Sequence, residues 1–83
     1  MERRIDIIAL IRAGRALLNI SQDDLALMAG VSRSVIARLE RNEPSVTLDS
    51  IDKIKSALER SGVVFLPPAN GLLGAVGLKA HRN

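Results

Sequence analysis

The stretch SQDDLALMAGVSRSVIARLERN, residues 21–42, decides the fold. Ser21 and Ser32 are favourable N-cap residues, because a serine hydroxyl can accept a hydrogen bond from the unpaired amide groups at a helix start. Gly30 lies between them and has the backbone freedom that a sharp turn requires. Asn42 follows Ile36 and Leu39, the apolar stripe of the second helix. Asparagine leaves a helix in a left-handed conformation more readily than most residues. The pattern predicts two short helices joined by a tight turn, which is a helix-turn-helix.

This stretch resembles the helix-turn-helix of the Cro/repressor-like (XRE) family of bacterial and phage DNA-binding regulators. The resemblance extends over residues 8–60. The residues that carry it are Ser21-Gln22, Leu25-Ala26, Gly30-Val31-Ser32, Ile36 and Leu39-Glu40. It implies a mainly α, repressor-like domain of four to five helices. The two motif helices are expected at residues 22–29 and 33–41.

A charged residue, Arg15, lies on the apolar face of the first predicted helix, residues 3–18. Ile11 precedes it by one turn on the same stripe, so the guanidinium needs a partner. Glu40 is the candidate, because it follows Ile36 by one turn on the core side of the second motif helix. The XRE resemblance implies the same pair. We therefore expect a structural ion pair between Arg15 and Glu40, with two solvated charges as the alternative.

The composition favours one small aliphatic domain. The chain has 83 residues, of which 47% are hydrophobic, and a single phenylalanine is its one aromatic side chain. There is no cysteine and the one histidine lies in the tail, so we expect no catalytic site, no metal site and no cofactor. A net charge of +3 is compatible with a DNA partner. Residues 62–78 are uncharged but contain two prolines and four glycines, so we expect no membrane segment.

The remainder of the chain predicts a fourth helix over residues 48–60, which Thr47 begins and Gly62 ends. Its expected inward positions are Leu48, Ile51, Ile54 and Leu58. We therefore divide the chain into a DNA-binding domain, residues 1–62, and a β tail, residues 63–83.

The β tail begins with an apolar run of strand length, made of Val63, Val64, Phe65 and Leu66. Asn70-Gly71 is a turn signal, after which residues 72–80 can return as a second strand. Both faces of the first strand are apolar, and a lone two-stranded ribbon cannot cover both. We expect the tail to join two copies across a two-fold axis through this run. A hairpin folded onto its own subunit is the alternative.

The second motif helix carries the residue types that read base edges. In this motif the N-terminal part of the recognition helix faces the major groove. Arg33, Ser34 and Arg38 are the expected base contacts, since arginine pairs bidentately with guanine and serine can donate or accept a hydrogen bond. The XRE resemblance assigns these positions to the bases. No acidic residue lies between Arg33 and Arg38, which weakens the alternative of a simply solvated helix face.

Four further positions are expected to contact phosphates. Gln22 and Ser32 match phosphate-contacting positions of the XRE family, and Arg41 with Asn42 lies at the far end of the recognition helix. Backbone amide groups at both helix starts add to phosphate binding. For Ser32, helix capping is an equally good explanation.

These observations predict a cytoplasmic homodimer that binds a palindromic double-stranded DNA operator and regulates transcription. Half-sites about one helical turn apart, ~10 bp, are expected for this motif. Repression follows from occupying a promoter, whereas activation requires contact with RNA polymerase or another regulatory protein, and both remain open. The alternative is an antitoxin or antiactivator-type protein-interaction module. Its evidence is Leu27 and Met28, which fall outside the apolar stripe of their helix.

Overall fold

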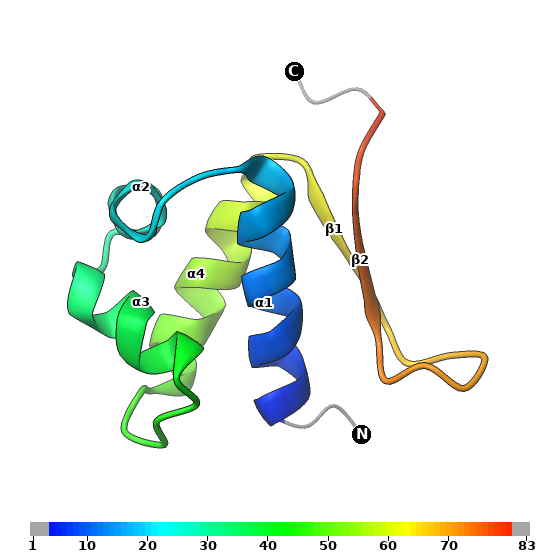
Figure 1. Ribbon diagram of the computed structural model, residues 1–83, viewed down its shortest axis with the longest axis horizontal. Coiled ribbons are helices and arrows are strands. Elements are labelled where there is room, and N and C mark those ends of the chain that lie inside the picture. Colours follow the sequence, from blue (N-terminus) through cyan, green and yellow to red (C-terminus); the bar gives the residue numbers. More distant parts are fainter. Residues whose placement is uncertain (1–3, 81–83) are drawn as a thin grey trace.

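The computed structural model describes residues 4–80, which form four helices followed by a two-stranded antiparallel sheet (Figure 1). The helices are α1 (Arg4–Leu18), α2 (Gln22–Ala29), α3 (Arg33–Glu40) and α4 (Leu48–Arg60), and the strands are β1 (Val63–Leu66) and β2 (Ala75–Leu78). The mainly helical fold with a short C-terminal hairpin, predicted from the sequence, is confirmed. The predicted first residue of the first helix, residue 3, and the end of the tail, residues 81–83, lie outside the described residues.

The two motif helices begin at the serines that the sequence indicates. The Ser21 hydroxyl accepts a hydrogen bond from the Asp24 amide at 3.0 Å, and the Asp24 carboxylate accepts one from the Ser21 amide at 3.1 Å. The Ser32 hydroxyl caps α3 in the same way, accepting from the amide three residues on at 3.3 Å. Gly30 (φ 72°) is the left-handed C-cap of α2, and Asn42 (φ 62°) takes the left-handed conformation directly after Arg41, the C-cap of α3. The local chemistry thus sets both ends of the helix-turn-helix.

The core is aliphatic and takes side chains from all four helices and β1. Its largest fully buried members are Ile8, Ile11, Leu25, Ile36, Leu39, Ile54, Leu58 and Val63. One expected inward position is wrong, because Leu48 is 70% exposed. Val46, two residues earlier in the preceding loop, is 3% exposed and takes the core position at this end of α4. Leu48 is the first residue of α4 and points toward solvent.

The tail forms a hairpin within its own chain. β1 and β2 pair in antiparallel register, from Val63 opposite Leu78 to Leu66 opposite Ala75. The hairpin lies against α1, on the side away from α3 (Figure 1). Gly14 of α1 permits this close approach, since an added Cβ would lie 3.2 Å from the Val63 side chain. β1 and β2 therefore pair within one chain, as in the alternative of a hairpin folded onto its own subunit. The association of two copies remains a proposal.

The difference between Leu48 and Ile51 gives a matched test of the core. Ile51→Ala should lower the free energy of unfolding by about 2–5 kcal/mol, because it leaves a cavity in the packed core. Leu48→Ala removes a side chain that is mostly in water and should change it by less than about 0.5 kcal/mol. Urea unfolding followed by circular dichroism measures both. Equal losses in the two variants would contradict the exposed position of Leu48.

Candidate nucleic-acid interface

The buried carboxylate of Glu40, at the end of α3, holds the motif against α1. Arg15 of α1 grips it bidentately: its Nε donates to Oε2 at 2.7 Å and its Nη2 to Oε1 at 2.9 Å. The Glu40 side chain is 8% exposed and the Arg15 side chain 25%. Arg15 and Glu40 thus meet where the sequence analysis expects an ion pair. A pair this well shielded from water resists screening by salt.

Further donors complete the environment of Glu40. Gln22, the first residue of α2, donates from Nε2 to Oε1 at 3.0 Å. Arg12 of α1 donates to the Glu40 backbone carbonyl at 3.0 Å, and Arg15 also donates to the Ile20 carbonyl at 2.9 Å. Glu40 of α3 is therefore hydrogen-bonded to both α1 and α2. Its partner Arg15 also bonds the segment that connects α1 to α2, at the Ile20 carbonyl.

The surroundings of Glu40 shift its pKa. Burial alone raises the pKa of the carboxyl, because it penalises the charged form. The hydrogen bonds from Arg15 and Gln22, together with the charges of Arg15 and Arg12, lower it by more. The net pKa of Glu40 lies below its ordinary value of 4.5, so the carboxylate is ionised at neutral pH.

With Ile36, Leu39 and Glu40 buried, the opposite face of α3 points to solvent. Ser34 lies on this face, and its hydroxyl is 3.1 Å from that of Ser32. Arg38 follows one turn later. Its hydrogen bonds are long, 3.4 Å from Nε to the Ser34 carbonyl and 3.5 Å from Nη1 to the Ser45 hydroxyl. Bonds of this length are readily exchanged for a ligand.

Arg33 has an acidic neighbour that the sequence analysis missed. Its Nε lies 3.5 Å from Oδ1 of Asp23, in the first turn of α2, and the two side chains are 67% and 70% exposed. Asp23 lies on α2, and the turn between the two helices brings it to Arg33, so the spacing of residues within α3 does not indicate this pair. An ion pair this exposed contributes roughly 0–1 kcal/mol, so it positions Arg33 without withholding it from a stronger anionic partner.

The expected phosphate contacts lie at the ends of the two motif helices. Ser32 and Asn42 are exposed at the two ends of α3. Arg41 is 63% exposed and bonds Glu43, with Nη2 2.6 Å and Nε 3.0 Å from Oε2, so it offers a phosphate less net charge than an isolated arginine. Gln22 is half-buried and oriented by Glu40.

Two contributors to this site, Arg12 and Ser45, were missed from the sequence. Arg12 bonds the carbonyl of Glu40. Arg15 was singled out because it lies on an apolar stripe, whereas Arg12 is an exposed helix residue that gave no such signal. Ser45 lies in the loop after α3 and meets Arg38 through the return of the chain toward α4. Contacts that depend on how a loop returns are invisible to helical periodicity.

The two residues that favoured a protein-interaction surface on α2 have separate environments. Met28 is half-buried and packs against the core, and its carbonyl accepts a hydrogen bond from Arg60 at 3.0 Å. Leu27 is 84% exposed. Exposed leucines that stand singly are common on protein surfaces.

Within residues 4–80, no three histidine, cysteine, aspartate or glutamate side chains gather in a way that could hold a metal ion. None of the four described helices has the length and apolar character needed to cross a membrane.

Comparison with known proteins matches the motif and its surroundings to a family. The model of a family described as helix-turn-helix matches residues 11–65, which is about two thirds of the chain. The match includes Arg15, the whole motif, α4 and the start of β1. A search of curated proteins found no match.

The pKa of Glu40 predicts how stability depends on pH. Because the folded-state pKa is depressed, the pair stabilises the protein above pH 4.5, and this contribution is lost as the pH falls through the lower folded value. At pH 7, Glu40→Gln should lower the free energy of unfolding by on the order of 3 kcal/mol. The difference from the wild type should shrink toward pH 3. Urea unfolding over this range measures it.

Glu59→Gln is the matched control, since it makes the same change at an exposed position of α4. Its effect should be less than about 0.5 kcal/mol at every pH. A Glu40→Gln effect that is equally large at pH 7 and pH 3 would show that the ion pair contributes nothing to stability.

Proposed function

The chain belongs to the helix-turn-helix (XRE) family of DNA-binding regulators, and from this premise we propose that it binds a palindromic duplex operator as a homodimer with α3 in the major groove. The single observation that supports this most is the outer face of α3. That face carries Arg33, Ser34 and Arg38 over a helix whose other side is locked to the core by Glu40. A rigid helix with donors on its outer face suits the reading of base edges.

The proposed base contacts follow from the direction of α3. Its N-terminal end enters the groove first in this motif, so Arg33 and Ser34 meet bases near the start of the half-site and Arg38 one helical turn further in. Arginine pairs bidentately with O6 and N7 of guanine. The long hydrogen bonds of Arg38 and the exposed pair of Arg33 are the kind that such a partner displaces. Two arginines on the face predict G·C pairs in each half-site.

Phosphate contacts are proposed for Gln22, Ser32, Arg41 and Asn42. A side-chain amide has two N–H donors, so Gln22 can hold Glu40 with one and present the other to a phosphate. In that arrangement the ion pair orients a DNA contact directly. The starts of α2 and α3 add exposed backbone amides, which attract phosphate groups.

Regulation of transcription is the proposed consequence of operator binding. A dimer on promoter DNA hinders RNA polymerase and represses, and this requires no effector site. We place the protein in the cytoplasm with the DNA it binds. Activation is the second possibility, and exposed Leu27 on α2 is the surface that RNA polymerase or another regulatory protein could contact.

A module that acts by binding another protein is the weaker candidate. Its support was an apolar surface on α2, but Met28 packs against the core, which leaves Leu27 as the one exposed large apolar residue of α2. DNA binding and protein binding differ in their response to salt, because phosphate contacts release counterions.

Selection from a library of random duplexes with the purified protein tests the proposed function. An enriched inverted repeat with G·C pairs in each half, bound less tightly as salt is raised, is the expected result. Weak, salt-sensitive binding with no enriched sequence would contradict it and favour the protein-binding module.

Arg38→Ala tests the proposed base contact. It should weaken binding to the selected site by about 1–3 kcal/mol and relax the preference at one base pair, while binding to random DNA changes less. Lys53→Ala is the control, because it also removes one exposed positive charge but from α4, outside the motif. Fluorescence anisotropy with matched and randomised duplexes measures both. Equal weakening on the two duplexes would make Arg38 a phosphate contact instead.

A further inference from the structure

The two faces of the hairpin have different environments. Val63, Phe65 and Val76 face inward: Val63 is 2% exposed, and Phe65 and Val76 pack against the core. Side chains alternate along a strand, so the outer face consists of Val64, Leu66, Ala75 and Gly77. Two of the four residues expected to join copies of the chain, Val63 and Phe65, are therefore occupied within their own subunit.

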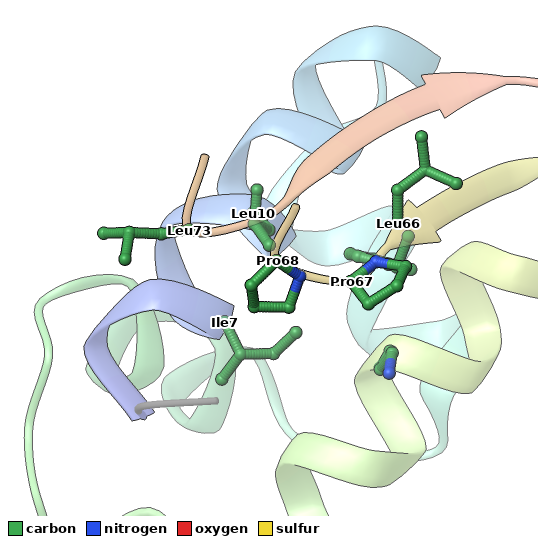
Figure 2. A pocket seen from close by; sticks show the side chains of 8 residues that line it. Ile7, Leu10, Leu66, Pro67, Pro68 and Leu73 are labelled. Carbon is green, nitrogen blue, oxygen red and sulfur yellow. The ribbon is translucent and has the colours of Figure 1, made fainter. Parts of the chain in front are cut away.

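The outer face is apolar, and each of its four residues is at least partly exposed in the described part of the chain. Leu66 is 54% exposed, and Val64, Ala75 and Gly77 are partly exposed. Figure 2 shows the Leu66 side chain directed away from Ile7 at the start of α1. A solvated sheet face normally carries polar side chains, which makes a wholly apolar one an indication of a partner.

Gly77 has no explanation within its own subunit. Four of the six glycines have a positive φ, namely Gly30, Gly62, Gly71 and Gly74. Gly14 lies beneath Val63 of the hairpin. The backbone of Gly77 needs no such freedom, and an added Cβ would meet no atom within 4 Å. Glycine weakens a strand, and it commonly marks a place where another backbone approaches closely.

From this face we propose that two copies of the chain associate by stacking the outer faces of their hairpins, a contact that rests on the homodimer of the proposed function. On β1, Val64 and Leu66 form a ridge, whereas Ala75 and Gly77 on β2 form a trough. A two-fold axis that runs along the strands, midway between them, places the ridge of each copy over the trough of the other. The face is therefore self-complementary, as a two-fold interface must be.

Charge favours a second copy over a different partner. The protein carries a net charge of +3, yet residues 61–78 contain no charged residue. Two positively charged copies meet with least repulsion at a neutral surface. A DNA or acidic protein partner would find nothing here to pair with.

The size of the face sets the strength of the contact. One face of two strands of four residues each can bury only a small area. This area is well below the ~800 Å² that each partner contributes to a standard interface. We expect dissociation in the range of about 10–100 µM. Binding to adjacent half-sites raises the local concentration of the two copies, so that DNA completes the dimer.

The position of the face predicts the spacing of the operator. The protein extends 34 Å along its longest axis, with α3 and the hairpin toward opposite ends (Figure 1). Dimers joined at the hairpin hold their recognition helices far apart. Half-site centres are therefore expected more than one helical turn apart, rather than the ~10 bp expected from the motif alone. A selected repeat with a one-turn spacing would place the interface elsewhere.

Sedimentation velocity over about 5–500 µM tests the stacked face in the full chain. The wild type should be a concentration-dependent dimer. Leu66→Glu should raise its dissociation constant about tenfold or more, because a charge would be buried without a partner. Leu27→Glu is the matched control: it makes the same change at an exposed leucine on α2 and should leave the constant unchanged.

Gly77→Val separates association from folding. In the monomer the added side chain meets open space and suits a strand, so thermal unfolding at low concentration should not weaken. In the dimer it fills the trough, and the dissociation constant should again rise about tenfold or more. A monomeric wild type, a dimer insensitive to Leu66→Glu and Gly77→Val, or equal loss in Leu27→Glu would each overturn the stacked face.

These outcomes are distinct from failure of the proposed function. A wild type that dimerises through this face but enriches no sequence from random duplexes would retain the stacked face and lose the operator. A wild type that enriches an operator but stays monomeric in solution and shows one-turn half-site spacing on DNA would retain the operator and lose the stacked face.

Discussion

The need to satisfy one buried carboxylate organises the helix-turn-helix. Glu40 ends α3 on the side that faces the core, where an unpaired charge would cost several kcal/mol, on the order of 3–5. Arg15 and Gln22 satisfy its oxygens, and Arg12 satisfies its carbonyl. These three donors come from α1 and the first residue of α2. The angle at which α3 leaves the domain is therefore set by directional polar contacts as well as by aliphatic packing, which is less directional.

The two sides of α3 have different roles, since one packs on the domain and the other faces solvent. The inner side carries the apolar residues and the anchored Glu40, and the outer side carries Ser34 and Arg38 with weak internal partners. Firm anchoring on one side leaves the other free to exchange its contacts for those of a ligand. Gln22 links the two, because it bonds Glu40 while standing at the start of α2, where a phosphate is proposed to lie.

The sequence predicted those features that depend on residues close together in the chain. It did not predict several others, which depend on contacts between distant segments. Capping serines and the turn at Gly30 act within a few residues, and helical periodicity placed Arg15 and Glu40 on facing stripes. Asp23 is close to Arg33 only because α2 and α3 are brought together by the turn between them. Val46, in the loop before α4, is buried in the core, whereas Leu48, which was expected there, is exposed. The apolar tail led to the prediction of a partner subunit, and this stays a prediction. Which face of the hairpin is left uncovered follows from its packing on α1, which periodicity alone cannot supply.

The central claim is that the outer face of α3, held in place by Glu40, is the surface that meets DNA. Amide chemical-shift mapping of the ¹⁵N-labelled protein against a duplex from the random selection tests it most directly. The account predicts the largest shifts at residues 32–38, with smaller ones at Gln22. Largest shifts on the hairpin or around Leu27, with α3 unchanged, would contradict it.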